Sequence, residues 1–284
     1  EELVRRGVKP AMVLDEGGAV VEGVFPGVKE KCAVVGIAEK GMMDVEFTVK
    51  SRGGHASAPP PHTPVGVLAK AVCAVENKPF PRRLTKPVAE MFHVLGRRST
   101  FAYRVIFANL WCFLPLLDAI CKKAGGELNA MMRTTCAFTK MEGSSAFNVL
   151  PPGAAVGANL RLIGGSSPQR TPEELRRRVN DPDVEIRMVH GQEPSPDSRT
   201  DGPAWERLCA AIAETWPEAL VSPYLMVACS DSRHYGRVSD AVYRFSCMEL
   251  SKEERALIHG NNERIPLEKI VKTAQFYYRL MKKC

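Results

Sequence analysis

Two short motifs at opposite ends of the chain carry side chains that bind metal ions in proteins. Apolar residues 12–14 lead into Asp-Glu-Gly-Gly at 15–18, the pattern of a buried strand that delivers a carboxylate to the edge of a sheet. His259 opens the stretch His-Gly-Asn-Asn-Glu at 259–263. A carboxylate and an imidazole are common zinc ligands. Because more than two hundred residues separate Glu16 from His259, only a tertiary fold could bring them together.

A third motif lies between them, the stretch Gly-Gly-His-Ala-Ser-Ala-Pro at 53–59. Its two glycines allow backbone conformations that other residues rarely adopt. The histidine of this motif, His55, either takes part in chemistry or lies in an ordinary turn at the end of a strand.

Composition limits the classes of function. The chain has 284 residues, enough for one large domain or two ordinary ones, and its 45% hydrophobic and 25% charged residues are typical of a soluble globular protein. The net charge of +7 comes from scattered arginines without an aromatic-flanked basic stripe, so no nucleic-acid partner is expected. None of the nine cysteines forms a Cys-x-x-Cys pair, which argues against a zinc ribbon or a redox motif. No signal peptide is visible, so the compartment stays open, with a weak lean toward an intracellular one.

The hydrophobic periodicity predicts two domains. Strands are expected at 8–14, 33–38, 43–50, 131–141, 154–163, 184–189, 223–228 and 241–245, and helices at 63–76, from 171, at 203–216, 231–237 and 267–281. Between 43 and 189 the order is strand, helix, strand, strand, helix, strand, which is the split βαβ arrangement of a ferredoxin-like α+β domain. The flanking alternation predicts a layered α/β domain. We therefore expect an α/β protein in which residues 1–41 plus 193–284 form one domain and residues 42–192 form an inserted one.

An apolar helical insertion covers roughly residues 86–124 of the inserted domain. Its most apolar part, 101–120, is interrupted by Arg104, Asn109, Pro115 and Asp118, whereas a spanning helix needs about 20 nearly uninterrupted apolar residues. The favoured interpretation is a helix packed on a neighbouring element or subunit, without a membrane partner. An interfacial membrane helix is the alternative.

Six stretches in order along the chain resemble the zinc-dependent carboxypeptidase S and aminoacylase family of amidohydrolases. They are Asp-Glu-Gly-Gly at 15–18, the motif at 53–59, Asn-Val-Leu-Pro at 148–151, Asn-Leu-Arg at 159–161, Ser-Asp-Ser-Arg-His-Tyr at 230–235, and the motif at 259–263. The apolar insertion before Asn148 is most similar to the carboxypeptidase S branch, which includes N-acyl-amino-acid hydrolases. The resemblance implies a two-zinc catalytic domain with an inserted lid that is also the dimerisation domain, and hence a homodimer. Cobalt or manganese could replace zinc at such a site.

The resemblance also implies a role for each motif residue. Glu16 matches a ligand of one zinc ion and His259 a ligand of the other. His55 matches a lid histidine that reaches into the active site of the partner subunit and stabilises the tetrahedral intermediate. Asn148 and Arg161 match substrate contacts, and Arg161 would bind the free carboxylate of an amino acid. Arg233 is either a second carboxylate contact or part of a structural ion pair.

Part of the family pattern has no counterpart in these residues. In the family, a His-x-Asp motif, a bridging Asp and a Glu-Glu pair precede the Asp-Glu-Gly-Gly stretch, and only fourteen residues precede Asp15 here. Catalytic zinc takes three protein ligands plus water. We therefore expect an incomplete N-terminal part of the catalytic domain, and expect that this chain alone neither binds zinc tightly nor hydrolyses a substrate.

The implied function belongs to a full-length parent or to a partner chain that supplies the other half. It is the attack of zinc-bound hydroxide on the amide bond of a peptide or an N-acyl amino acid with a free carboxylate. The alternative is a non-catalytic dimerisation or binding protein derived from the lid.

Overall fold

The computed structural model describes residues 1–23 and 25–284, which divide into two compact units. Unit 1 consists of Glu1–Glu39, Leu84–Met131 and Ser195–Cys284. Unit 2 consists of Lys40–Arg83 and Met132–Pro194. Unit 1 contains a mixed sheet with parallel strand pairs and unit 2 contains an antiparallel sheet, so the predicted α/β class with an inserted α+β domain is confirmed.

The sheet of unit 1 has the strand order β1-β10-β2-β9. These strands are β1 (Val13–Val21), β10 (Val242–Leu250), β2 (Cys32–Glu39) and β9 (Leu220–Met226). β1 runs parallel to β10 and β2 runs parallel to β9, whereas β10 and β2 are antiparallel. Because every residue of β2 is buried, its run of apolar residues forms a central strand rather than an alternating one.

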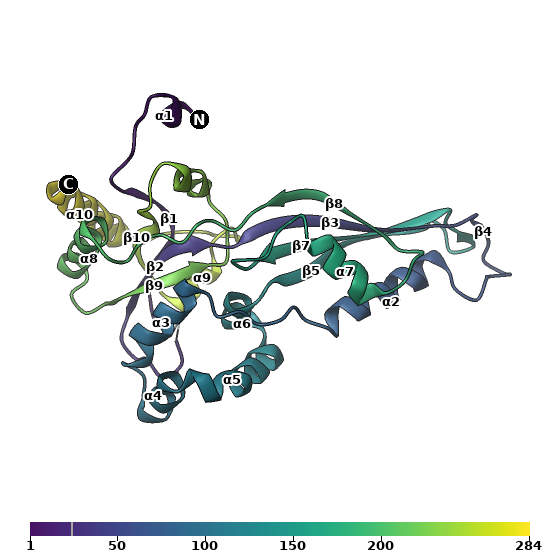
Figure 1. Ribbon diagram of the computed structural model, residues 1–284, viewed down its shortest axis with the longest axis horizontal. Coiled ribbons are helices and arrows are strands. Elements are labelled where there is room, and N and C mark those ends of the chain that lie inside the picture. Colours follow the sequence, from purple (N-terminus) through teal and green to yellow (C-terminus); the bar gives the residue numbers. More distant parts are fainter. Residues whose placement is uncertain (24) are drawn as a thin grey trace. The chain divides into compact units, whose positions relative to one another are not determined.

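The helices of unit 1 come from all three of its segments. They are α1 (Glu2–Arg5), α3 (Lys86–Gly96), α4 (Phe101–Ala108), α5 (Leu110–Ala124), α6 (Gly126–Met132), α8 (Pro203–Thr215), α9 (Lys252–Ala256) and α10 (Leu267–Lys283), with a 3₁₀ helix η1 at Asp231–Arg237. Helices α8 and α10 lie side by side (Figure 1). Their apolar faces enclose Trp216, Phe245 and Phe276, whose rings pack with centroids 5.7–6.1 Å apart. This aromatic cluster packs against the sheet that carries the Asp-Glu-Gly-Gly motif in β1.

The apolar insertion packs in unit 1, whereas the sequence suggested that it belongs with the lid. Helix α3 contacts β9, and Phe25 of unit 1 packs against two insertion residues. The ring centroid of Phe25 is 5.6 Å from that of Phe92 and 4.6 Å from that of Phe107, and the Phe92 and Phe107 rings stack 5.4 Å apart, so the three rings form one cluster. Periodicity identified the helices, but only packing decides which core receives their apolar faces.

Unit 2 is the predicted ferredoxin-like domain. Its antiparallel sheet has the order β5-β7-β3-β8. The strands are β3 (Gly41–Lys50), β5 (Thr135–Glu142), β7 (Gly153–Leu162) and β8 (Glu185–Gln192), and the helices are α2 (Pro64–Glu76) and α7 (Thr171–Val179). Alternate residues of β3 and β7 are buried against both helices, which cover one face of the sheet (Figure 1). A two-stranded ribbon of β4 (Gly54–His55) and β6 (Val149–Leu150) completes the unit.

Several predicted boundaries move. The first strand, expected at 8–14, begins at Val13 and continues to Val21 because Val20 and Val21 pair with β2. The strand expected from 131 begins at Thr135, since α6 extends to Met132. Helix α7 includes Thr171, which the sequence suggested as the N-cap; Arg170 takes that position.

Candidate functional site

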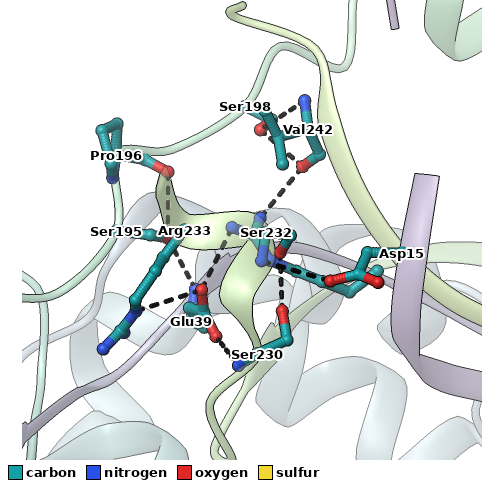
Figure 2. A network of polar contacts seen from close by, with 10 residues as sticks. Asp15, Glu39, Ser195, Pro196, Ser198, Ser230, Ser232, Arg233 and Val242 are labelled. Atoms are coloured by element: carbon teal, nitrogen blue, oxygen red, sulfur yellow. Dashed lines mark hydrogen bonds and ion pairs between the residues drawn. The ribbon is translucent and has the colours of Figure 1, made fainter. Parts of the chain in front are cut away.

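A network of buried polar side chains joins the strand ends of unit 1. Asp15 lies in β1, Glu39 ends β2, Arg244 lies in β10, and Ser230 and Arg233 lie at the start of η1. Figure 2 shows Asp15 and Glu39 pointing toward the segment of Ser230, Ser232 and Arg233 from different sides. Three parts of the chain that are far apart in the sequence, namely β1, the end of β2 and the η1–β10 region, therefore meet at one place.

Glu39 is the centre of this network. Its carboxylate accepts hydrogen bonds from the backbone N–H of Ser230 (2.6 Å), Nε of Arg233 (3.4 Å) and Nη2 of Arg244 (3.4 Å). The Glu39 side chain is fully buried, and those of Arg233 and Arg244 are 7% and 1% exposed. A buried carboxylate is tolerated only when it is paired and hydrogen-bonded, and Glu39 meets both conditions.

The charges of the network balance. Two arginines, Arg233 and Arg244, face the acids Glu39 and Asp15. Burial lowers the pKa of Arg244 because it penalises the charged form, while Glu39 and then Asp15 oppose this shift. Within the described residues, Nε of Arg244 is buried without a hydrogen-bond partner. The two acids thus offset part of the cost of burying the two guanidinium groups.

Asp15 orients the start of η1. Its Oδ2 accepts a hydrogen bond from the backbone N–H of Ser232 at 3.2 Å, and the hydroxyls of Ser230 and Ser232 lie 2.6 Å apart. This contact ties the Asp-Glu-Gly-Gly motif to the Ser-Asp-Ser-Arg motif. Two of the stretches that carried the resemblance are therefore neighbours in space.

The two glycines after Glu16 allow β1 to approach β2 and β10 closely. The register of β1 against β10 shifts between Asp15 and Gly18. A Cβ atom on Gly18 would lie 1.8 Å from the carbonyl oxygen of Val34, and one on Gly17 would lie 2.6 Å from Cβ of Arg244. Only glycine fits at these positions, and the irregularity leaves Glu16 exposed beside the half-buried Asp15.

Glu16 and His259 lie in the same unit, and both are exposed. His259 follows α9 and has φ 59°, a left-handed conformation that is uncommon outside glycine but that histidine adopts more often than most residues. Among residues 1–23 and 25–284, no hydrogen bond or ion pair joins Glu16 to His259, and no group of three or more His, Cys, Asp or Glu side chains could hold a metal ion. The donor types suit zinc, but the described residues do not form a complete metal site. The assignment of these two residues as ligands stays a prediction.

His55 and Asn148 are neighbours in unit 2. His55 pairs with Val149 across the β4–β6 ribbon, and the backbone carbonyl of Asn148 accepts a hydrogen bond from Ala56 N–H at 3.0 Å. Nδ1 of the His55 ring lies 3.1 Å from Oγ of Ser57, and both His55 and Asn148 are exposed. The ribbon therefore brings the backbones of His55 and Asn148 together.

Arg161 lies at the opposite end of the lid sheet. The ribbon joins β7 at Gly153, and Arg161 is eight residues further along that strand, about 26 Å at 3.3 Å per residue. The side chain is half-buried, and its Nε donates to Oδ1 of Asn159 at 3.1 Å, while Nδ2 of Asn159 donates to Asp44 at 2.8 Å. The structure thus brings two of the three predicted lid residues together and keeps the third apart.

For Arg233, the structure contains the ion pair that the sequence left as an alternative to a substrate contact. The contact with substrate stays a prediction. Sequence reasoning missed Glu39 and Arg244, although each gave a signal. Glu39 ends the apolar run at 33–38, and Arg244 interrupts the apolar run at 241–245. A charged residue within or at the end of a buried strand needs a partner, and here the two are partners of each other.

Comparison with known proteins identifies the family of this chain. The M20 peptidase dimerisation domain family matches residues 37–187. The chain is 36% identical to the N-fatty-acyl-amino acid synthase/hydrolase PM20D1 of Xenopus tropicalis, over 99% of this chain and 55% of that protein. It is 34% identical to the "Probable carboxypeptidase S-like 2" of Dictyostelium discoideum, over 95% of this chain and 52% of that protein. The chain thus spans about half the length of the curated relatives it matches.

Among solved structures, the fold is similar to that of the M20 family metallo-carboxypeptidase Sso-CP2 from Sulfolobus solfataricus. The TM-score is 0.66 at 17% identity, with 98% of this chain and 64% of that chain covered. The match to the dimerisation domain includes strands β3, β5 and β7 of the ferredoxin-like sheet, the first three residues of β8, and the insertion. Because the family match covers more than half of its residues, this chain belongs to the M20 peptidase family. Within that family it falls in the branch of the carboxypeptidase S-like proteins and PM20D1.

Proposed function

We propose that the whole protein is a metal-dependent hydrolase of the amide bond of N-acyl amino acids or small peptides with a free carboxylate, and that it acts as a homodimer joined through unit 2. The named relatives are hydrolases or carboxypeptidase-like proteins, and the matched family is that of a peptidase dimerisation domain. In this proposal Glu16 and His259 each contribute one metal ligand. Residues outside these 284, or on a partner chain, complete the ligand set and supply the general base.

The observation that carries the proposal is the separation of the recognition residues on unit 2. His55 and Asn148 lie at one end of the lid sheet, and Arg161 lies about 26 Å away at the other end. In an N-acyl amino acid the carboxylate and the scissile amide are joined through a single Cα atom, so they lie far closer together than this distance. The three side chains can therefore act on one substrate only if His55 and Asn148 come from one subunit and Arg161 from the other.

Each of these side chains suits its proposed task. The guanidinium of Arg161 would bind the substrate carboxylate through two parallel hydrogen bonds. The hydrogen bond between Ser57 and Nδ1 of His55 leaves Nε2 of the ring available to a substrate. A donor aimed at the developing oxyanion is worth roughly 3 kcal/mol of transition-state stabilisation. Asn148, on the same ribbon, would hold the scissile amide in register with His55.

The edge of the lid sheet supports self-association. β8 forms one edge of the four-stranded sheet, and Met188 and Val189 on it are exposed. An exposed edge strand with apolar side chains is a template for pairing with another strand. A second copy of unit 2 is the partner that the family match suggests.

Subunit complementation tests the proposal in the whole protein. His55→Ala and Arg161→Ala should each abolish hydrolysis of N-acyl amino acids and dipeptides. Mixed and re-equilibrated, the two variants should recover about a quarter of the wild-type activity, because half of the two-fold dimers are mixed and each has one intact site.

If His55 and Arg161 acted within one subunit, both sites of a mixed dimer would be damaged and no activity would return. That result would overturn the composite site. Absence of hydrolysis from the wild-type protein, with ligand binding retained, would instead favour the non-catalytic binding protein.

A further inference from the structure

Helix α5 presents an apolar surface to solvent. Between Leu110 and Cys121 its exposed residues are all apolar; they are Trp111, Cys112, Pro115, Leu116, Ala119 and Ile120. The Trp111 side chain is 84% exposed, and Phe101 at the start of α4 is 79% exposed. We name the surface formed by Phe101, Tyr103, Val105, Trp111, Leu116 and Ile120 the α4–α5 face.

Two of the polar residues that interrupt the apolar stretch, Asp118 and Asn109, do not interrupt this face. Asp118 is 4% exposed and forms an ion pair with Lys122 at 3.0 Å, so its carboxylate points into the protein. Asn109 lies at the bend between α4 and α5, and its Nδ2 donates to the carbonyl of Val105 at 2.9 Å. A group of exposed apolar side chains of this size is uncommon on a soluble protein and marks a surface that binds a partner.

Basic side chains flank the α4–α5 face. Residues 91–123 contain five lysines and arginines and a single acid, Asp118, which is buried. Arg97 and Arg98 precede α4, Arg104 lies within it, and Lys122 and Lys123 lie near the end of α5; all five are exposed. Aromatic and aliphatic side chains beside lysines and arginines match the chemistry of an anionic lipid surface, where apolar groups enter the acyl boundary and cations meet the headgroups.

The geometry favours a helix pair that lies on a membrane over one that crosses it. No single helix among the described residues is long and apolar enough to span a bilayer, and α4 and α5 pass such a test only as a pair bent by 112°. The fifteen residues of α5 extend about 22 Å, less than the roughly 30 Å hydrocarbon core. We propose that the α4–α5 face docks on an anionic phospholipid surface, with Phe101 and Trp111 inserted at the interface.

Vesicle flotation of the full chain tests this proposal. The protein should float with phosphatidylcholine vesicles that contain phosphatidylserine, bind more weakly to phosphatidylcholine alone, and be released by added salt. Trp111→Ser and Phe101→Ser should each weaken binding by about tenfold, which corresponds to about 1.4 kcal/mol. Phe147→Ser is the matched control, because Phe147 is a fully exposed phenylalanine of unit 2.

A charge exchange tests the second half of the proposal. The double variant Arg97→Glu with Arg98→Glu should lose binding to the anionic vesicles. Lys70→Glu with Arg177→Glu changes the net charge equally at exposed positions of unit 2 and should retain it. Vesicles with brominated acyl chains should quench the fluorescence of the wild-type protein more than that of Trp111→Phe.

Three outcomes would overturn the proposal. They are absence of flotation with both vesicles, equal losses from Phe101→Ser and Phe147→Ser, and self-association that Trp111→Ser abolishes without any vesicle binding. The last outcome would assign the face to a second copy of the chain. None of these measurements depends on hydrolysis, so the proposal stands or fails separately from the proposed function.

Discussion

Glu39 and Arg244 form a buried ion pair that joins the end of β2 to β10. Oε1 of Glu39 lies 3.4 Å from Nη2 of Arg244, and the side chains are 0% and 1% exposed. The same oxygen also meets Arg233, so one carboxylate connects two strands and η1. Because the Glu39–Arg244 pair lies beside Asp15, it supports the motif that carries Glu16.

Removal of the Glu39 charge should destabilise the protein strongly. Glu39→Gln leaves two buried guanidinium groups facing one acid fewer, and breaking a buried pair in this way costs about 3–5 kcal/mol. Glu46→Gln is the control, because the pair of Glu46 with Arg187 is exposed and worth about 0–1 kcal/mol. Urea unfolding measures both. Equal free energies of unfolding for the two variants would contradict the role assigned to Glu39.

Gly18→Ala should disrupt the sheet of unit 1. The added methyl group would lie 1.8 Å from the carbonyl oxygen of Val34, and backbone atoms of a central strand cannot move aside cheaply. Overpacking of this kind costs about 1–3 kcal/mol or more. Gly66→Ala in α2 should be close to neutral, since its nearest neighbour would be the Thr63 hydroxyl at 3.3 Å. Thermal unfolding followed by circular dichroism would show whether the two variants differ in this order.

Unit 2 should fold without the apolar insertion. The N–H of Arg83 donates to the carbonyl of Met132 at 2.8 Å, so the chain leaves and re-enters unit 2 at adjacent residues. The buried cluster of this unit contains no residue of 84–131 among those that the structure describes. A chain of residues 40–194 with a short Gly-Ser linker in place of 84–131 should therefore unfold cooperatively, because closing a short loop costs little.

Size-exclusion chromatography with light scattering would then test self-association of this shortened chain. A dimer is expected, and Val189→Lys on the β8 edge should shift it toward a monomer. A shortened chain that fails to show a cooperative transition would contradict the independence of unit 2.

The 284-residue chain should hold far less than one equivalent of zinc after purification. The described residues offer Glu16 and His259 but no group of three donors, and catalytic zinc takes three protein ligands. Elemental analysis measures this directly. If stoichiometric zinc survives dialysis and is lost in Glu16→Gln or His259→Asn, then the 284-residue chain forms a complete zinc site, which contradicts this prediction.

The local elements followed from the sequence because their physical signals are local. Local patterns of residue types reflect which side of an element faces a core or another strand. Examples are the alternation in β3 and β7, the apolar spacing of α2 and the glycines after Glu16. The order of these elements was enough to predict the ferredoxin-like domain, and the six motifs were enough to indicate the family.

Tertiary structure decided what depends on contacts between distant residues. The pairing of Glu39 with Arg244 joins positions 205 residues apart, and no local pattern specifies a partner for either charge. The same holds for the insertion. Periodicity predicted its helices, but it did not indicate which of the two units they pack in. It also holds for the long separation of Arg161 from His55, since strand register and direction set that distance. The sequence determined which faces of the helices and strands are apolar and which residue types can take part in chemistry. Only the folded structure determined which of these residues are in contact.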